Sequence, residues 1–180
     1  MNTVIVAGFG PFEGVIDNPS AAIADALDGC IFGGVRVIGR EMPVSFERSI
    51  EVCRLWIEGT GAMALIGIGV AMSRSTVMVE RRGGCPQDDG QLDVDHRTCP
   101  PGGHDAPSEV WSTVDAARLA SSIGAEVSDD AGTYVCNHWL YRAVQDFDIP
   151  VGFIHVPPNG LDTGALLRGI HEMWGDSNGE

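Results

Sequence analysis

The chain consists of short apolar runs separated by segments with helical spacing. Apolar and β-branched residues predict buried strands at 3–7, 35–38, 62–68 and 151–156. Capping signals and apolar spacing predict a helix that begins at Asn18–Pro19 and further helices over 46–57, 113–122, 134–147 and 163–174. Strands that alternate with helices in this way are typical of an α/β/α sandwich around a mostly parallel twisted sheet.

Weaker signals complete this outline. Short extended pieces are expected at 77–80 and 125–127, and Ser45 and Gly59 are expected to cap and to end the 46–57 helix. The segment 81–107 is rich in Gly, Pro and Asp, and a loop of that length inside a compact domain is usually functional. With 180 residues, of which 44% are hydrophobic, the chain is expected to form a single domain, 1–180.

Charge and cysteine content narrow the class of protein. The chain has 25 acidic and 11 basic residues, every basic one an arginine, and a net charge of −14. Such a surface repels nucleic acids and anionic membranes, and no stretch approaches the ~20 apolar residues of a membrane span. The N-terminus lacks a signal-peptide pattern, and five scattered cysteines do not form a disulfide framework. A cytoplasmic protein is therefore expected.

The most informative chemistry lies around Cys136 and His155. If Cys136 opens a helix, that helix carries the chain back about 15–18 Å at 1.5 Å per residue. The strand that ends near Val156 returns the chain about as far at 3.3 Å per residue. Both side chains are then expected at the carboxyl edge of the sheet, where sites form in open α/β sheets.

This shared edge favours a catalytic pair. A helix N-terminus stabilises a thiolate, and an imidazole within reach can act as base and then as acid. Considered separately, Cys136 could be a small buried hydrophobic residue and His155 a core histidine bonded to the backbone. Both interpretations stay open at this point.

Four blocks of the sequence resemble pyroglutamyl peptidase I, the pyrrolidone carboxylate peptidase family of cysteine peptidases. The first is GFGPFEGVIDNPS, and the second is GIGVAMSRSTVMVER, a glycine-rich turn followed by Glu80 and Arg81. The third is the loop CPQDDG, and the fourth comprises the cysteine and histidine segments AGTYVCNHWLY and GFIHVP. The blocks occur in the family's order between residues 4 and 157.

The resemblance implies a catalytic triad of Glu80, Cys136 and His155 and the removal of N-terminal pyroglutamyl residues from peptides without a cofactor or metal. Glu80 would orient His155 and stabilise its imidazolium. The Cys136 backbone N–H is the predicted oxyanion donor, and Arg74 is an auxiliary candidate. An apolar wall for the flat, uncharged lactam is expected from two loop phenylalanines and the two residues before the nucleophile, namely Phe9, Phe12, Tyr134 and Val135.

Some features depart from the family pattern. The Glu-Arg pair is followed by RGGC instead of a small apolar residue and an asparagine, and Pro158 replaces a tyrosine. The chain is also shorter than typical members, which leaves an assembly of several copies open. A diverged member that acts on another acyl amide, or an inactive one, is the alternative. A strand over 75–80 that starts at the catalytic edge would also carry Glu80 away from it.

Two other classes of protein share some of these sequence features. Gly8, Gly10 and Gly14 follow a first strand as in dinucleotide-binding oxidoreductases, but Pro11 and Phe12 stand where the phosphate-binding helix should begin. A metal site could use the side chains in the long loop, which are Cys85, His96, Cys99 and His104. Their spacing matches no regular zinc pattern, and we expect no bound metal.

Overall fold

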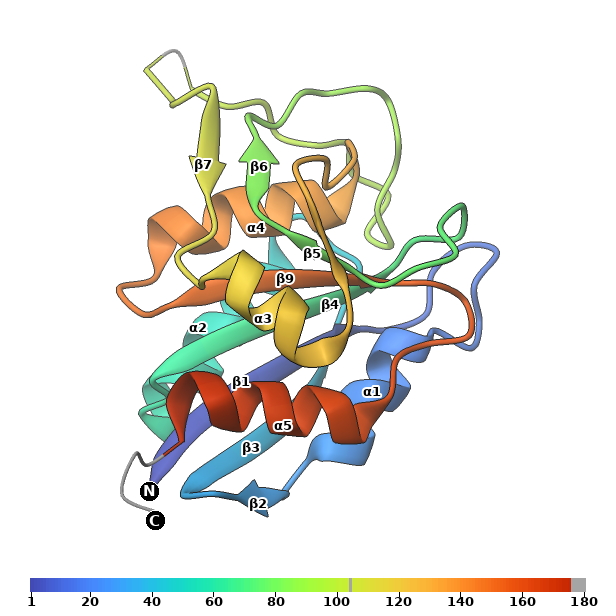
Figure 1. Cartoon of the computed structure of the whole chain (residues 1–180). Coiled ribbons are helices and arrows are strands. Elements are labelled where there is room, and N and C mark those ends of the chain that lie inside the picture. Colours follow the sequence, from blue (N-terminus) through green and yellow to red (C-terminus); the bar gives the residue numbers. More distant parts are fainter. Residues whose placement is uncertain (104, 176–180) are drawn as a thin grey trace.

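The centre of the protein is a seven-stranded sheet in the order β2-β3-β1-β4-β9-β5-β8 (Figure 1). The computed structural model describes residues 1–103 and 105–175. The strands are β1 (Asn2–Phe9), β2 (Ile31–Phe32), β3 (Val35–Met42), β4 (Ala64–Val70), β5 (Met78–Glu80), β8 (Glu126–Ser128) and β9 (Val151–Val156). Four neighbouring strands, β3, β1, β4 and β9, run parallel to one another. Strand β2 runs antiparallel to its neighbour β3, and β5 runs antiparallel to its neighbour β9.

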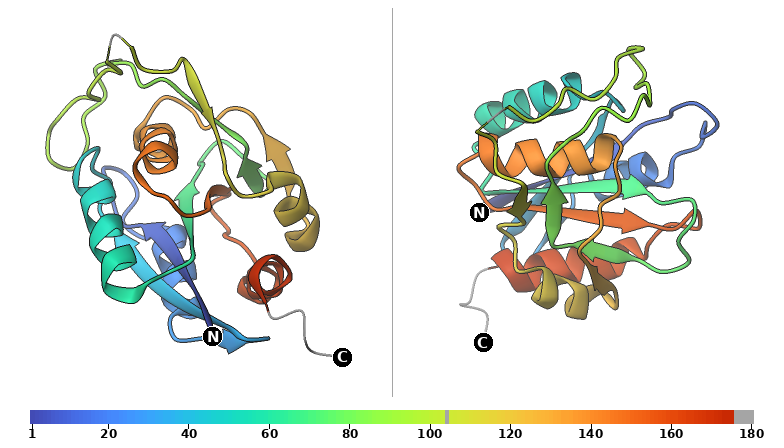
Figure 2. Two further views of the ribbon diagram at one scale, coloured as in Figure 1. Left: turned by 90° about the vertical axis from the view of Figure 1, so that its left-hand side faces the viewer. Right: turned by 90° about the horizontal axis from the view of Figure 1, so that it is seen from above.

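Helices cover both faces of the sheet (Figure 2). They are α1 (Pro19–Leu27), α2 (Arg48–Thr60), α3 (Ala116–Ile123), α4 (Val135–Asp146) and α5 (Thr163–Trp174). Helices α1, α3 and α5 pack on one face, and α2 and α4 pack on the other. The predicted α/β/α sandwich with a mostly parallel sheet is therefore confirmed.

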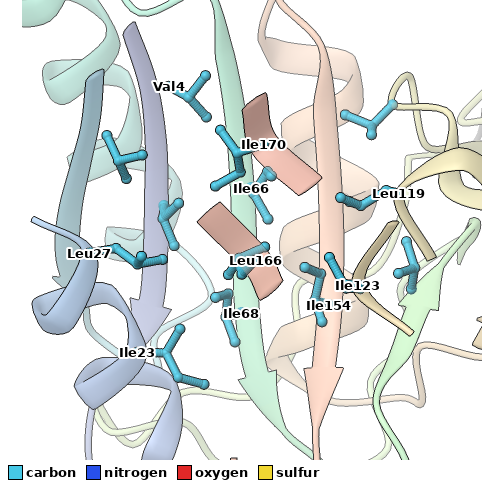
Figure 3. Packing of buried hydrophobic residues seen from close by; sticks show 14 of the residues in the cluster. Val4, Ile23, Leu27, Ile66, Ile68, Leu119, Ile123, Ile154, Leu166 and Ile170 are labelled. Atoms are coloured by element: carbon cyan, nitrogen blue, oxygen red, sulfur yellow. The ribbon is translucent and has the colours of Figure 1, made fainter. Parts of the chain in front are cut away.

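The core explains why the strands read as continuous apolar runs. Alternate residues of β4 enter different layers: Ile66 and Ile68 pack toward α1 and α5, and Leu65 packs toward α2 and α4. Figure 3 shows the first layer, in which Ile66, Ile68 and Ile154 of the sheet meet Leu166 and Ile170 of α5. A parallel sheet that is covered on both faces needs apolar residues on both sides of each strand.

Element boundaries follow the local signals closely, with a few differences. Asn18 caps α1 by accepting a hydrogen bond from the Ser20 N–H, as its position before a proline predicts. Ser45 accepts from the Arg48 N–H at the start of α2. The predicted stop at Gly59 is wrong, since α2 continues to Thr60 and ends at Gly61 with a positive φ of 62°. Strand β2 was not predicted, because its two residues carry no periodic signal.

The predicted loop over 81–107 is partly β-structure. Strand β6 (Arg82–Gly84) pairs with β7 (Glu109–Trp111) in a separate antiparallel sheet that projects beyond α4 (Figure 1). The intervening segment is held by Asp93, which is 5% exposed and accepts hydrogen bonds from the N–H groups of Phe46, Asp95 and Arg97. These contacts attach the segment to the start of α2.

The fold bears on the dinucleotide-binding alternative. After Gly10, α1 begins only at Pro19, so no helix N-terminus follows the glycines at the distance that a dinucleotide pyrophosphate needs. In residues 1–103 and 105–175, no group of three or more His, Cys, Asp or Glu side chains is arranged to bind a metal ion. His104 lies outside the described residues. Within the same ranges, no helix has the length and apolar character that crossing a membrane requires.

Candidate active site

Cys136 and His155 line one cavity of about 340 Å³ at the carboxyl edge of the sheet. Cys136 is the second residue of α4, and His155 is the penultimate residue of β9. The proximity that the helix and strand lengths predict is therefore present. His155 is nearly fully buried, whereas Cys136 is partly exposed to the cavity.

Glu80 reaches His155 from the neighbouring strand. β5 runs antiparallel to β9, and in its register Met78 lies opposite His155 while Glu80 lies opposite Phe153. Glu80 is thus two residues from His155 along the strand, on the same face, where diagonal neighbours are within reach of long side chains. Its Oε1 lies 2.8 Å from Nδ1 of His155. Strand β5 does carry Glu80 away from the carboxyl edge, as expected, but the Glu80 side chain is long enough to reach back to His155.

This contact determines the tautomer of His155. An ionised carboxylate only accepts hydrogen bonds, so Nδ1 of His155 carries the proton and donates to Glu80. Nε2 then remains for the Cys136 sulfur. Glu80 is completely buried, and its second oxygen, Oε2, has no hydrogen-bond partner among the described residues.

Electrostatics favour a protonated imidazole in the cavity. Burial alone would lower the pKa of His155, but the charge and hydrogen bond of Cys136 and the contact with Glu80 together raise this pKa to about 9. The imidazolium is then stable at neutral pH beside a thiolate. A neighbouring thiolate and imidazolium are the reactive pair of a cysteine nucleophile.

The N-terminus of α4 leaves backbone donors available near the sulfur. Tyr134 is the N-cap residue of this helix, and its side chain makes no capping hydrogen bond. The first N–H groups of a helix have no partner within the helix, and they attract negative charge. The Cys136 N–H belongs to this set, since Cys136 is the second residue of α4.

Strand β4, which lies beneath Cys136, has glycines where α4 comes closest to the sheet. A Cβ atom at Gly69 of β4 would lie 2.7 Å from the Cys136 sulfur and 2.9 Å from the Phe153 ring. At Gly67, the same addition would come within 2.5 Å of the Trp139 ring. The glycines of GIGV therefore let α4 rest directly on the sheet.

The four residues predicted to form the apolar wall separate into two groups. Tyr134 lines the cavity, and the Phe12 ring lies 6.4 Å from the Tyr134 ring. Phe9 and Val135 are 2% and 0% exposed, belong to the core beneath α2 and α4, and are not among the residues that line the cavity. Both side chains therefore contribute to core packing.

Several cavity residues were not singled out by the sequence. They come from the last residue of β4, the turn after it and the segment before α4, namely Val70, Ala71, Ser73, Asp130, Ala131, Gly132 and Thr133. The first segment follows β4 at the carboxyl edge, and that position was its only signal in the sequence. The second follows β8, which pairs parallel with β5 and so runs antiparallel to β9, and it carried no such signal. Arg74, which was singled out, lines the cavity and donates from Nη1 to Glu80 Oε1 over 2.5 Å.

A second cysteine–histidine pair lies elsewhere and differs in character. The Cys99 sulfur lies 3.5 Å from Nδ1 of His138 on the outer side of α4. Burial raises the pKa of Cys99 to about 11, and burial lowers the pKa of His138 to about 4. Both groups are therefore neutral at pH 7, so this pair lacks the ionic form expected at Cys136 and His155.

Comparison with known proteins identifies the family. A model described as pyroglutamyl peptidase matches residues 2–160. The chain belongs to the pyroglutamyl peptidase family. The pyrrolidone-carboxylate peptidase of Escherichia fergusonii is 34% identical over 172 residues, which cover 87% of this chain and 78% of that protein. The Bacillus cereus protein of the same name is 31% identical over 170 residues, 87% and 79% of the two chains.

Solved structures of pyroglutamyl peptidase relatives share the fold. A mutant pyrrolidone carboxyl peptidase of Pyrococcus furiosus superposes with a TM-score of 0.82 at 27% identity, over 95% of this chain and 97% of that one. The Thermococcus litoralis pyrrolidone carboxyl peptidase gives 0.81 at 27% identity, over 94% and 90%. The predictions of a hydrolase and of a cysteine-type omega peptidase of the pyroglutamyl peptidase family are therefore confirmed.

Proposed function

We propose that this chain hydrolyses the N-terminal pyroglutamyl residue from peptides, with Cys136 as nucleophile and His155 as acid and base. One observation carries the proposal: Cys136 and His155 line one cavity, and His155 donates from Nδ1 to the buried Glu80. The relatives named pyrrolidone-carboxylate peptidases support the substrate class.

The first half of the reaction forms a thioester. The Cys136 thiolate attacks the carbonyl carbon of the pyroglutamyl residue, and the carbonyl electrons move to oxygen. The Cys136 backbone N–H stabilises this oxyanion. When the intermediate collapses, the C–N bond breaks, and His155 gives its Nε2 proton to the departing amine. Glu80 keeps the imidazole oriented throughout.

The second half releases the acyl group. Neutral His155 takes a proton from a water molecule, and the resulting hydroxide adds to the thioester carbonyl. Collapse of this intermediate breaks the C–S bond, releases pyroglutamate and regenerates the thiolate beside the imidazolium. Each proton in this scheme moves between His155, water and the substrate, so the scheme uses no cofactor.

Recognition of the lactam is assigned to the side of the cavity at Tyr134. Pyroglutamate has no amino charge, because cyclisation has consumed it, so an apolar wall with a few hydrogen bonds suits it. Tyr134 and Phe12 offer such a surface, and the Tyr134 hydroxyl is already engaged, since it donates to the Leu92 carbonyl. That bond holds the ring in place.

The test is hydrolysis of a fluorogenic pyroglutamyl amide beside the matching prolyl and glutaminyl amides under reducing conditions. We expect release from the pyroglutamyl compound alone and its loss in Cys136→Ala. Cys30→Ala is the matched control, because Cys30 lies between α1 and β2, far from the cavity, and should keep wild-type activity. Folded wild-type protein that releases nothing from the pyroglutamyl amide would contradict the proposal and favour a diverged member of the family.

A further inference from the structure

Glu80 carries a charge that the protein must balance. Its carboxylate is completely buried, and one of its oxygens, Oε1, receives hydrogen bonds from both His155 and Arg74. The other oxygen has no partner among the described residues. A buried carboxylate is unfavourable unless charge and hydrogen bonds compensate for its lost hydration. Within residues 1–103 and 105–175, Arg74 and His155 are the cationic side chains in contact with it.

Arg74 is itself held from a second side. Its Nη2 donates to the Asp130 carbonyl over 2.5 Å and lies 3.5 Å from the Ser128 hydroxyl. The guanidinium therefore joins Glu80 on β5 to the segment between β8 and α4 that lines the cavity. Its Nη1 and Nη2 atoms are turned toward these partners, so Arg74 acts through Glu80.

The charges around the nucleophile form a balanced chain. With Cys136 as the proposed thiolate nucleophile, they are, from the cavity inward, the Cys136 thiolate, the His155 imidazolium, the Glu80 carboxylate and the Arg74 guanidinium, two negative and two positive. The other ionisable groups that line the cavity are Tyr134, a neutral phenol, and the Asp130 carboxylate, which accepts a hydrogen bond from the Gly132 N–H. Removal of Arg74 would leave the chain with an excess negative charge.

We propose that Arg74 is a positioning residue whose positive charge balances Glu80 and so keeps Cys136 in its reactive thiolate form near neutral pH. The inference rests on the proposed role of Cys136 as nucleophile. An added net negative charge favours protonation of every group in a coupled cluster. Without the Arg74 charge, the thiolate should therefore form only at higher pH.

The experiment measures the rate at which iodoacetamide alkylates Cys136 as a function of pH, resolved by mass spectrometry of the Cys136 peptide. In Arg74→Gln, where an amide can still donate to Glu80, the midpoint of the ascending limb should move up by roughly one pH unit. At a fixed pH below that midpoint, Cys136 of the variant should be alkylated about tenfold more slowly than Cys136 of the wild type. Cys30 in the same digest is the internal reference, and its profile should not move.

Arg74→Lys is the matched control. It keeps the charge but lacks the planar fork that contacts Glu80 and Asp130 together, so its midpoint should stay near that of the wild type. Folded Arg74→Gln with a wild-type midpoint would overturn the proposal and leave Arg74 as a structural brace. The same conclusion would follow if Arg74→Lys moved the midpoint as far as Arg74→Gln does.

If Arg74→Gln does not fold, the same substitution can be tested in a protein that also carries Glu80→Gln. In the double variant Glu80→Gln/Arg74→Gln, both buried charges are absent, so no unpaired charge opposes folding. Its midpoint should lie above that of Glu80→Gln alone, and equal midpoints would contradict the inference. Alkylation reports the thiolate without any substrate. A shifted midpoint in a protein that releases no pyroglutamate would therefore reject the proposed function while supporting the role of Arg74.

Discussion

At the scale of single residues, the described part of the chain contains two buried histidines, His138 and His155, whose surroundings shift the pKa in opposite directions. Burial dominates at His138 and lowers its pKa to about 4, whereas Cys136 and Glu80 overcome burial at His155 and raise its pKa to about 9. The difference arises from the partner charges and not from exposure, since both side chains are nearly inaccessible. Of these two histidines, it is His155 that carries a proton to donate at neutral pH.

The raised pKa of His155 predicts a pH dependence for catalysis. The ratio kcat/KM for a pyroglutamyl amide should fall as the pH rises through about 9, because the imidazolium then loses the proton that it gives to the amine. In Cys136→Ala, the pKa of His155 should drop, since the charge and hydrogen bond of Cys136 are gone while burial remains. NMR titration of the His155 ring protons measures this, and an unchanged pKa would contradict the assignment.

The stability of the folded protein should also depend on the protonation of His155. The pKa of His155 is higher in the folded protein than the ordinary value of 6.5, so its protonation stabilises the fold. That contribution is fully present below pH ~6.5 and is lost as the pH rises through about 9.

At the scale of elements, the packing of α4 on β4 decides where the nucleophile lies. Gly67 and Gly69 of β4 face α4, and neither position has room for a side chain. The Asn137 side chain also bonds both the N–H and the carbonyl of Gly84, which ties the start of α4 to β6. The cysteine is therefore placed by its neighbours on two sheets as well as by its own helix.

Gly69→Ala tests this placement. The added methyl group would displace the Cys136 sulfur, and a shift of about 1 Å in a reacting atom can lower the rate about 10²-fold. We expect kcat/KM to fall by that order, with a folded protein by circular dichroism. Gly59→Ala in α2 is the control, because nothing lies within 4 Å of the new atom. Full activity in Gly69→Ala would show that the sulfur tolerates displacement.

At the scale of the whole molecule, the net charge of −14 surrounds the cavity with a negative field. The pyroglutamyl end of a substrate is uncharged, so this field acts on the peptide that follows it. Charge complementarity of this kind acts on specificity and on the rate of association without requiring a single direct contact.

The field predicts a salt-dependent preference for basic peptides. At low salt, kcat/KM should be several-fold higher for a pyroglutamyl peptide with arginine in its leaving part than for one with glutamate. The difference should shrink between about 0.01 M and about 1 M salt, as the Debye length falls from 30 Å to 3 Å. Steady-state kinetics on the two peptides measures it. A ratio that does not change with salt would exclude steering by net charge.

Much of this protein could be predicted from its sequence because the relevant signals are local. The bounds of β9 and α5 match the apolar patterns residue for residue, and the Asn18–Pro19 pair marks the start of α1. The same local reasoning brought Cys136 and His155 to one edge, since helix and strand lengths follow from rise per residue. The family blocks then supplied Glu80 as a hypothesis.

Tertiary structure alone decided the rest, because it depends on which distant segments become neighbours. The antiparallel register of β5 on β9 brings Glu80 to His155, and no periodicity within 75–80 reveals that partner. Packing beneath α2 and α4 likewise buries Phe9 and Val135 while Tyr134 stays at the cavity. Local sequence specifies backbone conformation and burial tendency, whereas strand register and side-chain contacts between distant segments follow from the packing of the whole chain.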